Sequence, residues 1–301
     1  PFICLLPTSP LPPGHPIAEL PPRTFYRRNA AGASPLAPVR RVRAFKSKAL
    51  GRSVRTELLL PPAALGGPAG APVLYLNDGQ DVDAVALPAT LERLWASGEL
   101  PPLTVVAIHA NHDRMQEYGV SHSPDYRGRG ARAGQHAEFV VYELRPWVEA
   151  TYRPAIGRQH TAIAGFSLGG LSALDVAWNY FETFGTVGVL SGALWWRSRD
   201  VRDPAYSDAT DRLMHQRLAG APWRSSSQRF WFQTGTLDET NDRNHNGIID
   251  AIDDTLDALA ILRRRGYPEA DLRYLEIEGG RHHQTTWAVA LPDFLVWTFG
   301  R

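Results

Sequence analysis

The chain has 301 residues, of which 44% are hydrophobic and 21% are charged, a composition typical of a globular protein with a sizeable core. The 32 Lys and Arg residues nearly cancel the 31 Asp and Glu residues, so no basic surplus favours nucleic acid or an anionic membrane as a partner. No apolar stretch approaches the ~18 residues of a membrane-spanning helix. The single cysteine, Cys4, excludes an internal disulfide and leaves the compartment unassigned, cytoplasmic or secreted. Because the chain begins at Pro1 rather than Met, we expect a processed or truncated N-terminus.

The order of predicted elements favours an α/β fold. Residues 1–38 are rich in Pro, Ala and Gly, and we expect an extended arm there, ahead of a single domain over 39–301. Strands over 39–46 and 54–60 read as an antiparallel hairpin. From residue 73 strands and helices alternate: strands over 73–76, 103–109, 160–164, 184–190, 229–233 and 272–277, and helices over 89–96, 139–152, 168–181, 208–218, 253–265 and 287–299. This alternation predicts a mostly parallel sheet with helices on both faces, in the order of an α/β hydrolase.

The segment Gly165-Phe166-Ser167-Leu168-Gly169 reads G-x-S-x-G and stands between an apolar run and a helical pattern. Strand, tight turn and helix are the context of a nucleophile elbow, where a strained turn lifts a serine hydroxyl above the sheet. A Cβ at either glycine would collide where strand and helix cross. We therefore expect Ser167 to be a nucleophile rather than part of a plain glycine-rich turn.

A serine hydroxyl is a poor nucleophile and needs a histidine base that an acid orients. In α/β hydrolases the chain order is serine, acid, histidine, and both partners follow the ends of later strands. The loop after residue 233 offers Asp238 or Glu239, and the loop after residue 277 offers His282 or His283. Two glycines before the histidines let that loop turn sharply into the site, which favours His282.

Two backbone N–H groups are expected to bind the oxyanion. Leu168 stands at the N-terminus of the elbow helix, where an N–H points at a developing negative charge. The second donor should come from the loop after the first core strand. Gly79 allows a turn there that aims the N–H of Gln80, although an ordinary Asp-Gly turn is the alternative.

Residues 242–253 form a second motif, with oxygen-bearing side chains at positions 1, 3, 5, 9 and 12 and glycine at position 6. This is the spacing by which one short loop wraps Ca²⁺, and its final Asp resembles dockerin-type loops. An Asn/Asp/Gly-rich loop that caps the next helix is the alternative. The loop begins four residues after Asp238, so we expect a structural ion that orders the acid loop. The expected ligands are Asp242, Asn244, Asn246, the backbone carbonyl of Ile248, Asp250 and Asp253.

Taken together, these residues resemble the putative-esterase family of α/β hydrolases, which includes esterase D, enterochelin esterases, feruloyl esterase domains and mycolyltransferases. The resemblance spans about residue 40 to the end. It implies Ser167 as nucleophile, Asp238 as acid and His282 as base, with the N–H groups of Gln80 and Leu168 as the oxyanion hole. Enterochelin-esterase-like members often carry a Glu near the acid position, so Glu239 remains the alternative acid. The matching pieces are 74–80, Arg114 with 117–119, 165–171, 191–196, and 279–282 with Trp287.

Four side chains are candidates for the substrate cleft. Trp195 and Trp196 follow the strand beside the nucleophile strand and suit an aryl or sugar-linked ester, with capping of the sheet edge as the alternative. Arg114 and Tyr118 belong to a long polar loop over 111–135, and loops of this length are often lids or binding loops. Arg114 either pairs with a substrate carboxylate or braces the loop.

We therefore expect a serine carboxylesterase that hydrolyses a small-molecule ester through an acyl-enzyme on Ser167. No organic cofactor, nucleic acid or membrane partner is expected. One alternative is an acyltransferase or another acyl hydrolase with the same triad. Another is a non-catalytic, calcium-dependent binding module, although the intact Ser–Asp–His order argues against it. The ester (aryl, acetyl, feruloyl or siderophore) and the oligomeric state stay open.

Overall fold

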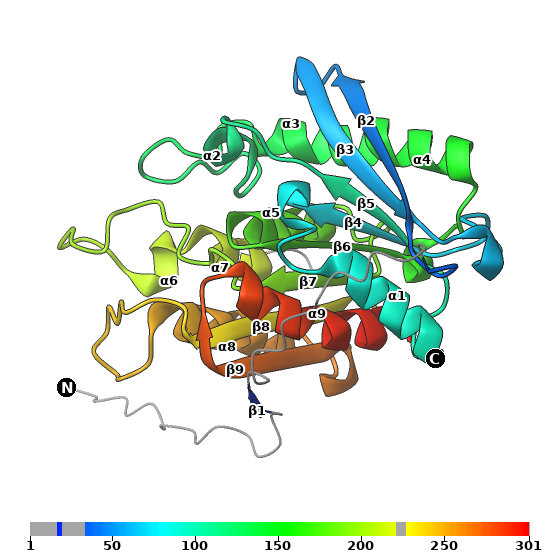
Figure 1. The fold of residues 1–301 in the computed structure, drawn as a ribbon. Helices are drawn as coiled ribbons and strands as arrows, with labels where there is room; N and C mark the ends of the chain where they lie inside the picture. The colour runs from blue at the N-terminus through cyan, green and yellow to red at the C-terminus, as the bar shows by residue number, and fades with distance from the viewer. Residues whose placement is uncertain (1–16, 20–33, 221–226, 301) are drawn as a thin grey trace.

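The computed structural model describes residues 17–19, 34–220 and 227–300, and the nine strands of these residues form one sheet in the order β1-β9-β8-β7-β6-β4-β5-β3-β2 (Figure 1). β3 pairs antiparallel with β2 and with β5, and every other neighbouring pair is parallel. The predicted hairpin and parallel sheet are thus confirmed. The strands are β1 (Ile17–Glu19), β2 (Val39–Ser47), β3 (Arg52–Leu60), β4 (Val73–Asn77), β5 (Thr104–Ile108), β6 (Thr161–Phe166), β7 (Thr186–Leu190), β8 (Arg229–Leu237) and β9 (Leu272–Arg281).

Most of the predicted arm over 1–38 lies outside the described residues. Within it, Ile17–Glu19 forms β1 and pairs with Glu276, Ile277 and Glu278 of β9. At the opposite edge, the long strand β2 is exposed along most of its length.

Helices cover both faces of the sheet. One face carries α1 (Leu87–Ser97) and α9 (Gln284–Phe299), which lie in front of the sheet in Figure 1. The other face carries α3 (Ala133–Glu138), α4 (Arg145–Tyr152), α5 (Leu168–Asn179), α7 (Leu213–Gly220) and α8 (Asp250–Arg264). The short helices α2 (Arg114–Glu117) and α6 (Asp208–Asp211) lie in loops.

The central strands are apolar throughout because both of their faces are covered. Val105 and Val106 are adjacent on β5 and face opposite sides, yet both are 0% exposed. Val106 belongs to the core beneath α5, and Val105 to the core beneath α1 and α9. Each fully buried Val or Leu contributes about 1.5–3 kcal/mol to folding relative to an exposed one. Packing on both faces therefore stabilises the positions of the central strands.

Two predicted helices differ from the structure. The helix expected over 208–218 is interrupted at Arg212, whose backbone is extended (φ −80°, ψ 95°). At this one-residue break Arg212 forms an isolated antiparallel bridge with Arg197, and its guanidinium Nη1 lies 3.1 Å from Asp254 Oδ1 and 2.7 Å from Asp257 Oδ2 on α8. The helix expected over 139–152 begins earlier, at Ala133, and is π-helical over Phe139–Leu144.

The strands β8 and β9 run farther than predicted, to Leu237 and Arg281. A Cβ on Gly235 would overlap the backbone of Gly280, so two glycines permit the close approach of these strand ends. A bulge between Gly235 and Leu237 then changes the direction of the chain at the end of β8. Asp238 and His282 consequently follow the strand ends directly, at the same edge of the sheet as the end of β6. No helix among the described residues has the length and apolar character to cross a membrane.

Candidate active site

The strand-to-helix turn at Ser167 has the strain of a nucleophile elbow. Ser167 adopts φ 55° and ψ −121° between the end of β6 and the first residue of α5, a conformation that costs a non-glycine residue about 1–3 kcal/mol. Its N–H donates to Leu190 O at 2.9 Å and its carbonyl accepts from Ala193 N at 3.0 Å. A Cβ on Gly165 would overlap the backbone of Gly169, as the sequence predicted. The end of β7 thus fixes the elbow.

Asp238 and His282 line one pocket of about 200 Å³, together with Ser191, Gly192, Trp195, Glu239 and Ala251. The Asp238 side chain is buried, and neither of its carboxylate oxygens has a hydrogen-bond donor at bonding distance among the described residues. Burial, the largest effect, raises the pKa of this carboxyl, while the nearby Gly235 backbone, the Ser191 hydroxyl and the His282 charge lower it. An acid buried without a donor is ready to accept one from a histidine ring.

His282 follows β9 and its ring meets the Trp287 indole edge-on, with 5.4 Å between ring centroids. Burial of the ring lowers its pKa below 6.5, the Asp238 charge opposes that shift, and the Arg114 charge adds to it. The ring is therefore biased toward the neutral form that a general base requires.

The two alternative residues face other partners. His283 is the N-cap of α9, and its Nδ1 accepts from Thr285 N at 3.2 Å. Glu239 accepts from Asn241 Nδ2 at 2.7 Å, and burial raises its pKa without any contribution from His282. His282 and Asp238 are the pair that act on each other.

Residues 77–80, the loop in which the sequence predicts an oxyanion donor (hereafter the oxyanion loop), differ in detail from that prediction. The left-handed turn is made by Asp78 (φ 61°), not by Gly79. Gly79 is required for another reason, since a Cβ there would lie 2.7 Å from the carbonyl carbon of Ala107 on β5. Gln80 follows in a single 3₁₀ turn, and Leu168 is the first residue of α5. Their role as oxyanion donors stays a prediction.

Arg114 and Tyr118 brace this loop. Arg114 donates to both Asp78 carboxylate oxygens, from Nε at 2.7 Å and from Nη2 at 2.8 Å. Tyr118 is 1% exposed, and its hydroxyl oxygen accepts from Asp78 N at 3.2 Å. The expectation that Tyr118 faces a cleft is therefore corrected, and of the two roles considered for Arg114 the structure contains the bracing one.

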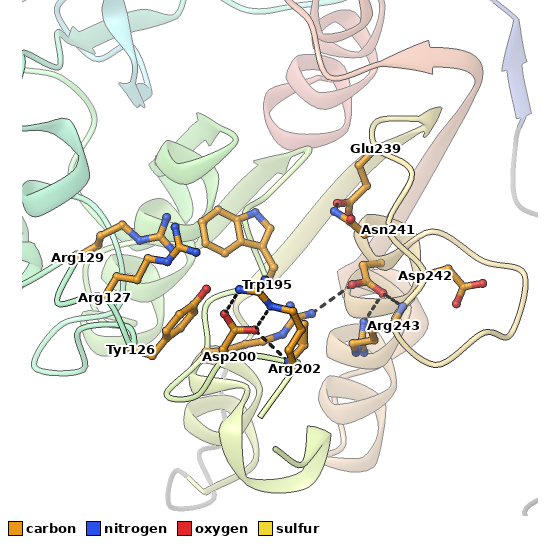
Figure 2. A pocket seen from close by; sticks show the side chains of 13 residues that line it. Tyr126, Arg127, Arg129, Trp195, Asp200, Arg202, Glu239, Asn241, Asp242 and Arg243 are labelled. Carbon is orange, nitrogen blue, oxygen red and sulfur yellow. Dashed lines mark hydrogen bonds and ion pairs between the residues drawn. The ribbon is translucent and has the colours of Figure 1, made fainter. Parts of the chain in front are cut away.

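The two tryptophans also differ from each other. Trp196 is fully buried and its indole Nε1 donates to Ser123 O at 3.1 Å, which corrects its expected place in a cleft. Trp195 is half-buried and lines two pockets, the one with His282 and a larger one of about 520 Å³. Figure 2 shows the Trp195 indole in this larger pocket, between Arg127 and Arg129 on one side and Glu239 on the other.

The charges of the larger pocket are mostly paired. Arg129 pairs with Asp125, and its guanidinium carbon lies 4.8 Å from the Trp195 ring centroid. Arg202 pairs with Asp200 at 2.9 Å between Nη2 and Oδ2. The pocket therefore offers two aromatic side chains, Trp195 and Tyr126, within a nearly neutral, strongly polar wall.

The predicted calcium loop is compact and polar. Asp242 accepts from the N–H groups of Asn246 at 3.1 Å and Gly247 at 2.9 Å, and Asp253 accepts from the side-chain amides of Asn244 at 2.9 Å and Asn246 at 3.3 Å. Hydrogen bonds thus link four of the predicted ligands, three in the loop and Asp253 in the first turn of α8. No group of three or more His, Cys, Asp or Glu side chains within residues 17–19, 34–220 and 227–300 is spaced to hold a metal ion.

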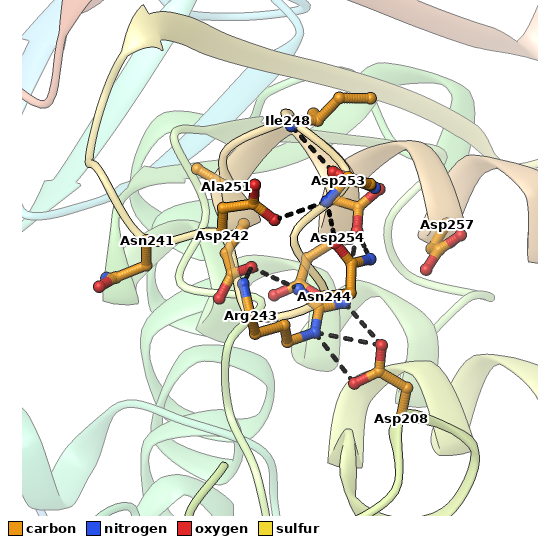
Figure 3. Close-up of polar contacts among 12 residues, drawn as sticks. Asp208, Asn241, Asp242, Arg243, Asn244, Ile248, Ala251, Asp253, Asp254 and Asp257 are labelled. Carbon is orange, nitrogen blue, oxygen red and sulfur yellow. Dashed lines mark hydrogen bonds and ion pairs between the residues drawn. The ribbon is translucent and has the colours of Figure 1, made fainter. Parts of the chain in front are cut away.

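Asp250, the fifth side chain predicted as a ligand, faces away from that group. Its Oδ1 accepts from Arg243 N at 3.0 Å and from Arg243 Nη1 at 2.9 Å. Arg243 extends beneath the loop to Asp208, as Figure 3 shows, with 2.9 Å between Nε and Oδ1. Ile248 stands at the surface of the loop, where its N–H donates to Asn246.

The sequence reading assigned no role to two residues that hold this site together. Trp287 stacks on Phe166, with 4.9 Å between ring centroids and 19° between planes, and its Nε1 donates to Ser191 Oγ at 3.0 Å. Ser191 itself has φ 45°. The signal for Ser191 was a serine directly after a buried strand, as at Ser167.

A family model described as "Putative esterase" matches residues 47–298. The chain belongs to this family. It is therefore an enzyme, a hydrolase of carboxylic esters, rather than a non-catalytic binding module.

The curated relatives include an uncharacterized protein and an esterase. The chain is 22% identical over 251 residues to protein YbbA of Bacillus subtilis, covering 82% of this chain and 93% of that one. It is 28% identical over 176 residues to an iron(III) salmochelin esterase of Escherichia coli, covering 57% of this chain but only 40% of the relative's length.

Solved structures share the fold. A ferulic acid esterase superposes with a TM-score of 0.66 at 19% identity, covering 88% of this chain and 98% of that one. An enterochelin esterase of Shigella flexneri superposes with a TM-score of 0.67 at 21% identity, covering 87% and 59%. The α/β-hydrolase architecture is thereby established.

Proposed function

We propose that the chain is a serine carboxylesterase in which Ser167 is the nucleophile, His282 the general base and Asp238 the acid that orients it. The observation that carries the proposal is the strained Ser167 at the end of β6, beside a pocket that holds a buried Asp238 without a donor and a His282 biased toward neutrality. Catalytic hydrogen bonds tighten when substrate binds.

The chemistry follows from those positions. His282 accepts the proton of the Ser167 hydroxyl as the oxygen attacks the ester carbonyl, and the backbone N–H groups of Gln80 and Leu168 bind the resulting oxyanion. His282 then passes the proton to the leaving alkoxide, and a water activated in the same way hydrolyses the acyl-enzyme. Asp238 stabilises the imidazolium that forms in both steps.

The substrate class that fits is a small-molecule ester. Trp195 and Glu239 line both the pocket with His282 and the larger polar pocket, so a group beyond the ester would stack on the Trp195 indole. A panel of aryl, acetyl, feruloyl and siderophore esters would rank the substrates.

Covalent labelling tests the mechanism. A fluorophosphonate should label the wild-type chain at one site, identified as Ser167 by peptide mass spectrometry, and Ser167→Ala should lose both the label and the ester hydrolysis. Ser97→Ala is the control, because this exposed serine at the end of α1 lies outside the pocket with His282 and should keep the label. Labelling that persists in Ser167→Ala would contradict the assignment.

We further propose that residues 242–253 bind one structural Ca²⁺. Asp242, Asn244, Asn246 and Asp253 share the loop face, the Ile248 carbonyl would be a fifth ligand, and Asp250 would contribute through water because Arg243 holds it. Ca²⁺ would leave the reaction to the side chains and would order the loop after Asp238.

A chelator tests this second proposal. Excess EGTA should lower the Tm of the wild-type chain by several degrees, because a bound ion stabilises only the folded state. The variant Asp242→Ala should have the lower Tm already and show no response to the chelator. An unchanged wild-type Tm with no calcium by elemental analysis would contradict calcium binding.

A further inference from the structure

The carboxylate of Asp78 stands between the oxyanion loop and the nucleophile elbow. Its side chain is 1% exposed, and the two hydrogen bonds from Arg114 are the bidentate kind that fixes both groups in one plane. The Arg114 side chain is 28% exposed, so the guanidinium lies between the buried carboxylate and the solvent.

The same guanidinium reaches the elbow. Arg114 Nη2 lies 3.3 Å from the carbonyl oxygen of Phe166, the residue before the nucleophile. On the helix side, a Cβ on Gly169 would overlap the Asp78 carboxylate, so this carboxylate packs directly on the first turn of α5. Arg114 therefore contacts both segments that carry the proposed oxyanion donors.

The Asp78 carboxylate also fixes the residue that follows in the loop. Asp78 Oδ1 accepts from Gln80 Nε2 at 2.9 Å, while Gln80 Oε1 accepts from Ala110 N at 3.1 Å. Both ends of the Gln80 amide are thus held. The backbone of Asp78 is left-handed, a conformation that persists only where surrounding contacts over-determine it.

We propose that Arg114 is a positioning residue: by holding the Asp78 carboxylate against Phe166 and α5, it keeps the N–H groups of Gln80 and Leu168 aimed at one oxyanion. This inference rests on the proposed function, since it assigns a task within that reaction. Arg114 touches no reacting atom, so its effect belongs in kcat and not in substrate binding.

The guanidinium has a second, separable effect through its charge. The charged groups that act on His282 are Asp238, after β8, and Arg114, on α2, while Asp78 and Asp81 act on Arg114 from the loop after β4. The positive charge of Arg114 lowers the pKa of His282 and the negative charge of Asp238 raises it. Loss of the cation should raise that pKa, and a lysine should preserve it.

The experiment compares Arg114→Gln and Arg114→Lys in the full chain, with p-nitrophenyl acetate as the probe. Ser167→Ala establishes the background. Arg217→Gln is the matched control, because Arg217 is 21% exposed and pairs with the buried Asp175 of α5 at 2.9 Å, away from the oxyanion loop. Thermal melts of all variants report folding.

Arg114→Gln should lower kcat about 10- to 100-fold with KM within about threefold, a fraction of the loss from deleting an oxyanion donor outright. Its acid limb of kcat/KM should move to higher pH. Arg114→Lys should keep the wild-type acid limb and recover part of kcat, and Arg217→Gln should lose stability without this loss of kcat.

Two results would overturn the inference alone: a loss confined to KM, which would make Arg114 a substrate ligand, or a kcat in Arg114→Gln equal to that of Arg217→Gln at the same folded fraction. Hydrolysis that survives in Ser167→Ala would instead overturn the proposed function, and this inference with it.

Discussion

The two halves of the candidate site are held in opposite ways. On the nucleophile side, Ser167 and the oxyanion loop are tied by backbone bonds, by the bidentate Asp78–Arg114 pair and by glycines that admit close approach. On the acid–base side, the Asp238 carboxylate has no donor at bonding distance among the described residues, and His282 is held chiefly by its contact with Trp287.

The difference indicates which half is preorganised. Donors that bind a transition-state charge must be fixed before the reaction, because their reorganisation would cost part of the stabilisation they give. A base and its acid can instead tighten when substrate fills the pocket. Substitutions on the nucleophile side should therefore act through geometry, and those on the acid–base side through charge.

The largest effect is expected on the acid–base side. Asp238→Asn should lower kcat by about 10³- to 10⁴-fold, because an amide cannot stabilise the imidazolium or fix the ring tautomer. Glu239→Gln is the control in the adjacent position and should stay within about threefold. Steady-state kinetics on one ester decides between them, and the reverse ranking would assign the acid to Glu239.

Gly169→Ala should break the preorganised half. The added methyl would overlap the Asp78 carboxylate and displace the oxyanion loop, so we expect kcat to fall about 10- to 100-fold with a smaller change in KM. Gly220→Ala is the control, since a Cβ there has open space. Unchanged kcat in Gly169→Ala would mean that the loop tolerates displacement.

Trp195→Ala should act on selectivity. Loss of the indole face should lower kcat/KM for methyl ferulate by about tenfold, the scale of one aromatic stack, and leave methyl acetate within about threefold. Trp195 lines both pockets, so the ratio of the two esters reports whether substrate spans them. An equal loss for both esters would point to collapse of the site instead.

The smallest effect is on pH dependence. Burial and the Arg114 charge lower the pKa of His282 from its ordinary 6.5, so the neutral base persists below that pH and is lost as the pH falls through the lowered pKa. The acid limb of kcat/KM should accordingly lie below pH 6.5, measured from about pH 4 to about pH 8. A limb above 6.5 would show that Asp238 outweighs both effects.

Periodicity and motif spacing predicted the architecture well, because the apolar strands and the elbow are local patterns. The alternation after residue 73 predicted the parallel sheet, and G-x-S-x-G predicted the turn that the structure shows at Ser167. The break at Arg212 was missed because its contacts are distant in sequence: a backbone bridge with Arg197 and ion pairs with carboxylates on α8.

Side-chain roles in the site were less predictable, since they depend on contacts between distant segments. Trp195 and Trp196 are neighbours in sequence, yet only the second is fully buried, against Gly119 and Gly130. Asp78 rather than Gly79 takes the left-handed turn, because the glycine is needed beside the β5 backbone. Neither outcome is visible in a local pattern.

The exposed edge of the sheet has a consequence for how molecules of this protein meet one another. β2 leaves one line of backbone donors and acceptors without a neighbouring strand among the described residues, with Val42 exposed between Arg41 and Arg43. Like charges on two approaching edges repel, which opposes the joining of sheets into fibres. Salt screens that repulsion over about 10 Å at 0.1 M, so light scattering of concentrated protein should rise with ionic strength.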